Sequence, residues 1–235
     1  MNEVKLVEVN DEPNHQEVFQ NQFIRIYKIN LEPGRDTLYH RHSKDTLYIV
    51  LEGGLMFTYV IGKQTLSSVS FPKSFGLLQK IRFLLNNYFF RTAKLDTSLF
   101  LFQHHRDYPV VHKVIASAKN VNNIQLIGIE ILEENIQHPT PSFDHMFYTK
   151  EYCSKVISIF RLKLKPGRST DIHTCNFPGM TVVIEGSCTI LTQKYSPKSH
   201  QLKAGDYEWH DCLENRNIIN SSTTNLVALL FIIGC

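Results

Sequence analysis

The chain has 235 residues, of which 43% are hydrophobic and 20% are charged, a balance typical of a folded globular protein rather than a disordered one. Its formal net charge of +3 is too small to indicate nucleic-acid binding, and its apolar runs are too short or too interrupted to predict a membrane span. The N-terminus has no signal-peptide pattern and the five cysteines form no CxxC pair, so we expect free thiols and a cytoplasmic location.

Two segments of the chain, 23–53 and 156–186, are copies of one another. They align without a gap at an offset of 133 residues, and 11 of the 31 aligned positions are identical. In both copies apolar and polar residues alternate with a period of two, and a Pro-Gly pair at 33–34 or 166–167 marks a turn between strands. The pattern predicts an all-β fold built from two related sandwiches or barrels.

Each copy is followed by a further apolar strand, predicted at 124–131 in the first module and at 226–233 in the second. Between the modules, 133–142 contains two prolines and no apolar pattern, which is typical of a linker. We therefore predict an N-terminal domain at 1–133 and a C-terminal domain at 140–235.

One stretch of the first module departs from this pattern. Between residues 53 and 95 there is no Asp or Glu, but there are six basic residues. Within it, 75–91 has the pattern of a basic amphipathic helix. A membrane-surface or nucleic-acid role is the less favoured explanation. We interpret about 66–97 as an insertion in the N-terminal module, or as retained intron sequence in the gene.

The repeat carries a spaced histidine motif. Gly34 is followed after five residues by His40 and His42, then by Thr46, and Gly53 closes the motif. This spacing resembles the first motif of the cupin superfamily, in which a glutamate stands at the position of Thr46. The second copy has the same spacing from Gly167 to Gly186, with Cys175 and Gly179 in place of the second histidine and the glutamate.

The second cupin motif is weaker in this chain. Gly205 and Asn220 match its ends, but Arg216 stands where the family has a histidine. Aligning the last strands of the two modules places His112 opposite Arg216. His112 is therefore the candidate third histidine of the first module.

The resemblance implies a tandem bicupin, two jelly-roll (double-stranded β-helix) barrels, with a metal held by His40, His42 and His112. Side chains at i and i+2 of a strand share a face, so His40 and His42 would both point into the barrel. Three neutral imidazoles leave the full charge of a divalent ion uncompensated, which favours an anionic or thiolate substrate. Asp45 is a poor substitute for the glutamate because its position predicts the opposite face.

Other polar side chains receive structural interpretations. His104 and His105 could replace His112, but we expect them to face solvent. Tyr48 is predicted to be a core or wall residue. Glu52 and Glu185 precede the closing glycines of the two copies, where a structural role is expected.

In the second module, His173 and Cys175 could bind a soft metal. The cation of Arg216 would oppose a metal ion there, so we expect no working second site. Arg216 would instead pair with a carboxylate, either that of a ligand or that of Glu185.

A three-histidine site without a carboxylate is similar to that of thiol dioxygenases in the same superfamily. We therefore predict a metal-dependent small-molecule enzyme, a dioxygenase-like oxidoreductase whose divalent transition metal is Fe(II). Isomerase, lyase or hydrolase chemistry with Zn, Mn or Ni stays open, and no catalytic residue is assigned. The competing hypothesis is a non-catalytic bicupin with decayed metal sites. The expected partners are a small molecule and a second copy of the chain, with no nucleic acid and no membrane.

Overall fold

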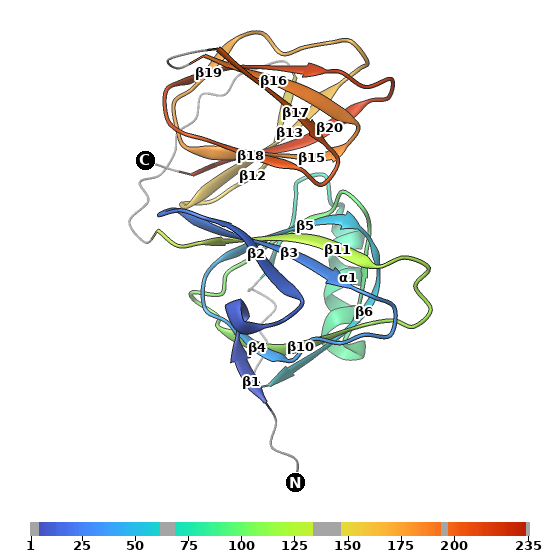
Figure 1. Ribbon diagram of the computed structural model, residues 1–235. Coiled ribbons are helices and arrows are strands. Elements are labelled where there is room, and N and C mark those ends of the chain that lie inside the picture. Colours follow the sequence, from blue (N-terminus) through green and yellow to red (C-terminus); the bar gives the residue numbers. More distant parts are fainter. Residues whose placement is uncertain (1–4, 62–68, 134–146, 194–196, 234–235) are drawn as a thin grey trace. The chain divides into compact units, whose positions relative to one another are not determined.

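The protein is dominated by β-strands, which confirms the predicted all-β class (Figure 1). Its structure is a computed structural model that describes residues 5–61, 69–133, 147–193 and 197–233. The chain divides into two compact units, residues 1–134 and residues 135–235. From residue 134 on, the linker expected at 133–142 lies outside the described residues.

The N-terminal unit consists of two sheets. In spatial order the first contains β1 (Leu6–Glu8), β4 (Tyr39–His42), β10 (Val110–Ala116), β6 (Gly54–Ile61) and β8 (Thr92–Leu95). The second contains β2 (His15–Gln20), β3 (Ile24–Leu31), β11 (Ile124–Ile131), β5 (Thr46–Glu52), β9 (Phe100–Gln103) and β7 (Val69–Ser70). A short 3-10 helix, η1 (Val9–Asp11), connects β1 to β2. The β1–β4 pair is parallel, and the other pairs of this unit are antiparallel.

The C-terminal unit repeats this two-sheet plan. Its first sheet contains β12 (Tyr148–Cys153), β13 (Ile157–Leu164), β20 (Leu226–Ile233), β15 (Gly179–Glu185) and β18 (Tyr207–His210). Its second contains β14 (His173–Cys175), β19 (Glu214–Asn220), β16 (Ser187–Gln193) and β17 (Pro197–Lys203). All of these strand pairs are antiparallel.

The two units share irregularities as well as strands. A β-bulge at Leu51 in β5 recurs at Ile184 in β15, and a bulge at Val18 in β2 recurs at Glu151 in β12. All of these positions are related by the offset of 133 residues. Because a bulge moves every following side chain to a new register, the repeated bulges keep equivalent side chains on equivalent faces. The repeat therefore extends back to β2 and β12, before the segments that are similar in sequence.

The turn after β3 explains why glycine recurs in the motif. Gly34 and its counterpart Gly167 have backbone φ values of +79° and +70°, which residues with a Cβ adopt only under strain. The preceding proline fixes its own φ and favours this turn.

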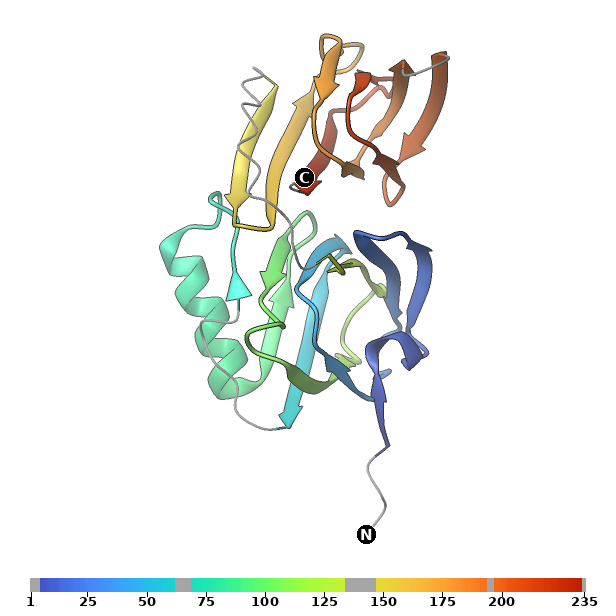
Figure 2. The ribbon, with the colours of Figure 1, turned by 90° about the vertical axis from the view of Figure 1, so that its left-hand side faces the viewer.

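The predicted helix in the unusual segment is confirmed as α1, Leu77–Phe90. It lies on the outside of the N-terminal barrel in both ribbon views (Figures 1 and 2). Phe83 is 9% exposed and packs with the core of this unit, next to Phe71. After α1 the chain enters β8, which pairs with β6. The segment is thus built into the barrel rather than appended to it.

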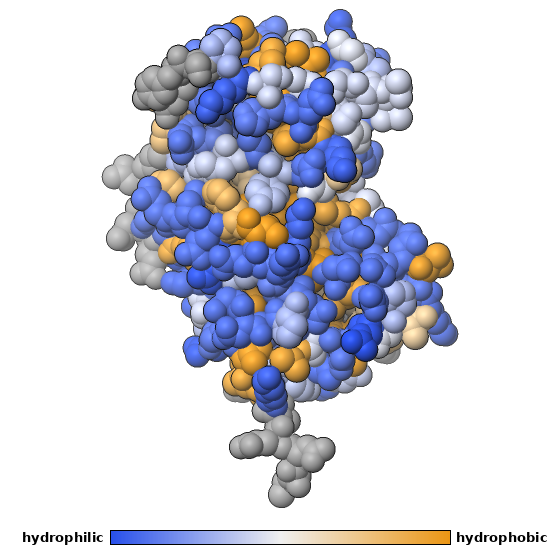
Figure 3. Space-filling view, in the orientation of Figure 1, coloured by the Kyte–Doolittle hydropathy of each residue, from blue (hydrophilic) through white to orange (hydrophobic). Residues whose placement is uncertain are grey.

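Alternation along the strands separates apolar side chains from water. In β3, for example, Ile24, Ile26, Ile29 and Leu31 are buried whereas Lys28 and Asn30 are exposed. On the face shown in Figure 3, hydrophilic residues accordingly cover most of both units. Within the described residues, no helix reaches the length and hydropathy needed to cross a membrane.

Candidate metal centre

The three predicted histidines meet inside the N-terminal barrel. His40 and His42 project from β4 and are 0% and 1% exposed, as the i, i+2 spacing predicted. His112 lies on the neighbouring strand β10, directly opposite His40 in the antiparallel register. The ring centroid of His112 is 4.6 Å from that of His40 and 5.0 Å from that of His42. A strand pairing between distant segments therefore brings the three imidazoles together.

A fourth histidine, His15 on β2, joins them and was missed by the sequence analysis. It is 7% exposed, and its ring centroid lies 4.7 Å from that of His40. Ligand atoms of His15, His40 and His42 all lie within 4.8 Å of one another, so these residues form a group that could hold a metal ion. The offset of 133 pairs His15 with Tyr148, and this replacement of histidine by tyrosine hid the position from a search for shared residues.

Hydrogen bonds fix the tautomers of two of these histidines. His40 Nδ1 donates to the carbonyl of Leu38 at 2.9 Å, and His15 Nδ1 lies 2.6 Å from a carboxylate oxygen of Glu12. Each Nδ1 therefore carries the proton, and each Nε2 presents a lone pair. This is the usual arrangement around metal-binding histidines, in which an outer partner orients the ring.

Burial keeps His40, His42 and His112 neutral. It lowers the pKa of His40 to about 4, with a further lowering from the neighbouring His15. It also lowers the pKa of His42 and of His112 well below the usual value, and the other histidines add to the effect. Neutral imidazoles are the form that binds a metal ion.

The distance between His40 and His112 also fits a shared ion. Their Nε2 atoms lie 3.0 Å apart. Two nitrogens that each lie about 2.1 Å from one ion, at right angles about it, would be separated by about 3.0 Å. The donor set and this spacing are what a divalent transition metal requires.

Three of the histidines, His15, His40 and His112, line a small apolar cavity of about 70 Å³. Its polar side chains other than the histidines are Thr37, Tyr48 and Gln103. The rest of the lining is aliphatic, from Ile29, Leu31, Val50, Met56, Leu95, Leu101, Val114 and Leu126. No Lys, Arg, Asp or Glu is among these lining residues.

Where the cupin motif has a glutamate, this chain has Thr46, which offers no carboxylate to a metal ion. Thr46 is buried, and its hydroxyl donates to the carbonyl of Lys44 at 2.8 Å. The carboxylate of Asp45 accepts the backbone N–H of Arg106 at 3.0 Å. Neither side chain belongs to the group that could hold a metal ion.

The structure changes the interpretation of His105 and supports that of Tyr48. His105 does not face solvent, because it is 1% exposed and stacks on His42 with ring centroids 4.9 Å apart. Tyr48 is a wall residue as predicted, and its hydroxyl lies 3.3 Å from His42 Nδ1. His104 lies apart from the cluster and contacts the hydroxyl of Ser70 at 2.9 Å.

In the C-terminal barrel the equivalent positions carry an ion pair. His173 lies opposite Arg216 in the register that joins His40 to His112, which supports the alignment of His112 with Arg216. Arg216 is 1% exposed, and its guanidinium pairs with Glu208 and donates to the hydroxyl of Thr181. Arg216 therefore pairs with a carboxylate, as expected, but this carboxylate belongs to Glu208 rather than to Glu185.

The thiol of Cys175, a candidate soft-metal ligand, is buried in the same barrel. Burial raises the pKa of the Cys175 thiol to about 11, although Arg216 partly opposes the shift, so the thiolate is scarce at neutral pH. Among the described residues, those of the C-terminal unit contribute no group of three potential ligands close enough to share an ion.

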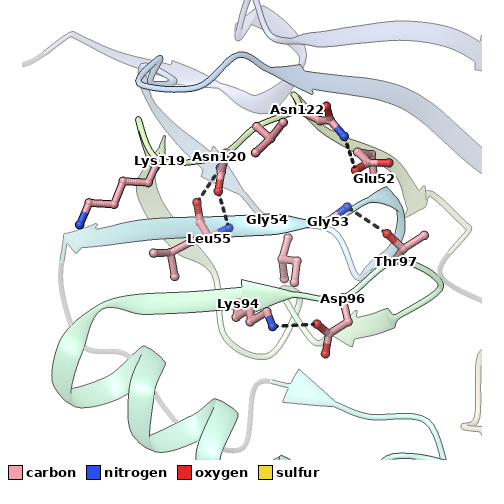
Figure 4. A pocket seen from close by; sticks show the side chains of 12 residues that line it. Glu52, Gly53, Gly54, Leu55, Lys94, Asp96, Thr97, Lys119, Asn120 and Asn122 are labelled. Carbon is pink, nitrogen blue, oxygen red and sulfur yellow. Dashed lines mark hydrogen bonds and ion pairs between the residues drawn. The ribbon is translucent and has the colours of Figure 1, made fainter.

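A larger hollow at the surface of the N-terminal unit does not compete with the histidine cavity (Figure 4). Its polar side chains already bind one another: Asn122 donates to Glu52 at 3.1 Å, and Lys94 lies 3.8 Å from Asp96. Asn120 bonds the backbone of Leu55 in both directions. Glu52 thus has the structural role that its place before the turn predicted.

Comparison with solved structures identifies the fold. The chain is similar to the manganese-containing oxalate decarboxylase of Bacillus subtilis, with a TM-score of 0.58 and 10% identity over 91% of this chain and 69% of that chain. It is also similar to the oxalate decarboxylase of Lactobacillus farciminis, with a TM-score of 0.56 and 9% identity over 91% and 78%. These decarboxylases are bicupins.

The chain has the tandem bicupin fold. AerE of Microcystis aeruginosa is a further similar structure, with a TM-score of 0.51 and 10% identity over 94% of the present bicupin and 98% of AerE. No protein-family model and no curated protein matches this bicupin in sequence. The resemblance inferred from the doubled histidine motif is therefore confirmed at the level of fold.

Proposed function

We propose that the N-terminal barrel is the active site of a metal-dependent enzyme acting on a small molecule. The observation that carries this proposal is the buried cluster of four histidines, of which His15, His40 and His112 line one apolar cavity and His42 packs beside them. Burying polar imidazole nitrogens is costly unless they are paired, and without an ion the Nε2 atoms of His40 and His112 can pair with one another across 3.0 Å, the separation that a shared ion would also allow. The ligands we propose are His40, His42 and His112, as the sequence predicted, together with His15.

The chemistry we favour is an oxidation that uses dioxygen. A bound Fe(II) ion would supply an open coordination position and an electron source at the cavity. The aliphatic lining excludes water, and the hydrogen bonds of His15 and His40 hold both rings in the ligating tautomer. Burial raises the pKa of Tyr48, so its hydroxyl stays protonated and can donate a hydrogen bond to a ligand in the cavity.

Manganese is the main alternative metal, because one of the similar bicupins contains Mn(II) centres. A manganese-dependent reaction falls within the same proposal of a metal-dependent enzyme. A homodimer and a cytoplasmic location stay predictions.

A second candidate function is a non-catalytic, ligand-binding bicupin. Two observations favour it: the replacement of the family's glutamate by Thr46 and the small volume of the cavity, about 70 Å³. Both would also be compatible with an enzyme for a very small substrate.

Metal analysis separates these candidates. Purified protein, reconstituted anaerobically with Fe(II) and separately with Mn(II), should retain close to one equivalent of metal. The double variant His40→Ala/His42→Ala should retain less than about a tenth of an equivalent, because two of the ligands are gone. The matched control, His173→Ala/Cys175→Ala in the second barrel, should load like the wild type.

The outcomes are decisive for the two candidates. A wild type that retains no metal would contradict the enzyme proposal and leave the non-catalytic bicupin. A loaded wild type is then screened for oxygen consumption with small carboxylates and thiols. Turnover that disappears in the double variant would support the dioxygenase-like chemistry.

A further inference from the structure

Glu12 is a buried carboxylate with unusually complete hydrogen bonding. Its side chain has no exposed surface. Besides His15 at 2.6 Å, it accepts the backbone N–H of Asn14 at 2.8 Å, the side-chain amide of Asn14 at 3.0 Å and the backbone N–H of Leu38 at 3.2 Å. It is placed there by η1, after which the N–H of Glu12 bonds the carbonyl of Val9.

This environment favours the ionised carboxylate. Burial alone would favour the neutral acid, but the backbone N–H groups of Asn14 and Leu38 and the side-chain amide of Asn14 all donate to the carboxylate and favour its charged form. Glu12 is not among the residues that line the cavity, so its charge reaches the site through the ring of His15. Such carboxylate–histidine pairs are common behind metal ions and increase the basicity of the ligating nitrogen.

We propose that Glu12, acting through His15, supplies the negative charge that the family's missing glutamate would have supplied, and that the site therefore selects a small ligand with a single negative charge. This inference rests on the proposed metal site. Glu12 is a positioning residue in it, since it touches His15 and not the metal or the ligand.

The charge balance gives the ligand class. A divalent ion with neutral histidines and one carboxylate leaves a net charge of +1, which one negative charge on a ligand neutralises. No Lys or Arg lines the cavity to balance a second negative charge, and a buried unpaired charge is costly.

The size and lining of the cavity narrow the class further. A cavity needs about 10–15 Å³ of such volume to hold one water molecule, so a cavity of about 70 Å³ has room for a ligand of only a few non-hydrogen atoms. The aliphatic walls favour a short alkyl body over a second polar group. The expected ligand is a short-chain monocarboxylate or monothiolate.

The inference can be tested with Co(II) as a spectroscopic probe of the metal site. Co(II)-loaded protein is titrated with acetate, propionate, malonate and acetamide at constant ionic strength, and changes in the Co(II) absorption report binding. The monoanions should bind at least about tenfold more tightly than the dianion malonate, since the second charge of malonate has no partner in the cavity. Neutral acetamide should not bind.

The variant Glu12→Gln keeps the shape of the side chain and removes its charge. We expect its metal dissociation constant to rise by about 10- to 100-fold, as for other outer partners of ligating histidines. Because the net charge of the loaded site becomes +2, the preference for monoanions over malonate should shrink or disappear. Glu52→Gln, the same change at the surface hollow, should alter neither quantity.

His15→Gln provides a second route if Glu12→Gln is poorly folded by circular dichroism. It removes the connection between Glu12 and the metal and should cause the same loss of selectivity. If the wild type binds Co(II) but Glu12→Gln and His15→Gln retain its affinity and its preference for monoanions, the inference is wrong and the metal site stands. If the wild type binds no metal under any condition, the proposed function fails and this inference fails with it.

Discussion

The two barrels of this bicupin have the same scaffold and opposite interiors. Their strands, turns and β-bulges match at an offset of 133 residues through β5 and β15. At the equivalent interior positions, four histidines in the first barrel correspond to a different set in the second: Tyr148, His173, Cys175 and Arg216. The backbone was retained while the side chains that face the cavity changed.

The comparison shows that the electric charge at one interior position can be balanced in two ways. In the second barrel, the cation of Arg216 is balanced by Glu208, which belongs to the protein. In the first barrel His40, His42 and His112 carry no charge at neutral pH, so their position is available to an external cation. The following predictions test this difference between the two barrels.

The largest effect is expected from Glu208→Gln in the second barrel. It leaves the guanidinium of Arg216 buried without its partner charge, and the free energy of unfolding should fall by about 3–5 kcal/mol. Urea unfolding followed by the fluorescence of Trp209, the single tryptophan of the chain, reports on this barrel directly.

The double variant Glu208→Leu/Arg216→Leu is the control for that experiment. Replacing both charges with apolar groups should cost much less than removing one of them. If the single variant is as stable as the double variant, the ion pair does not balance the interior as described.

Metal should stabilise one barrel and not the other. At a free metal concentration of 100 times the dissociation constant, the first barrel should gain about 2.7 kcal/mol. Hydrogen exchange followed by mass spectrometry would show slower exchange in β4 and β10, with the Trp209 transition unchanged. Equal protection of β14 and β19 would show that the metal binds in both barrels or outside them.

Acid should weaken the metal-free first barrel through histidines such as His105. Burial lowers the pKa of His105 to about 4, whereas in the unfolded chain it is about 6.5. Between these values the unfolded chain binds a proton that the folded chain does not, so stability is lost as the pH falls through this window. His105 should contribute about 1.4 kcal/mol per pH unit to the slope.

His105→Phe tests that sign, because a phenyl ring can stack on His42 without titrating. Between pH 6 and pH 4.5, in the presence of a chelator, the variant should lose stability less steeply than the wild type. Parallel slopes would mean that His105 is charged in the folded protein.

The smallest effect is expected at the surface hollow. Asn122→Ala removes an exposed hydrogen bond to Glu52 and should change the free energy of unfolding by less than about 0.5 kcal/mol. Metal content should also be unchanged. A loss of metal in this variant would indicate that the hollow, rather than the histidine cavity, is connected to the site.

The sequence was informative where a local pattern decides the structure. The alternation of apolar residues predicted the strands, and the His-x-His spacing placed His40 and His42 on one buried face. The placement of His112 needed only the strand pairing that the repeat provided.

Other members of the site could not be found in this way. His15 reaches the cavity because β2 pairs with β3, and the bulge at Val18 interrupts the alternation along this strand. His105 lies in the connection after β9, where no periodic pattern indicates which way a side chain points. Both depend on tertiary packing, which a single sequence does not encode locally.

The helix α1 has one further consequence, for the way in which the site is assembled during folding. His40 and His112 are 72 residues apart in sequence, whereas their counterparts, residues 173 and 216, are separated by only 43. Loop-closure entropy grows only with the logarithm of loop length, so the longer connection costs about 0.5 kcal/mol. The contacts of Phe83 with the core are large enough to offset such a cost. The connection between β4 and β10 therefore accommodates α1 with little loss of stability, because the paired strands that carry His40 and His112 do not have to move.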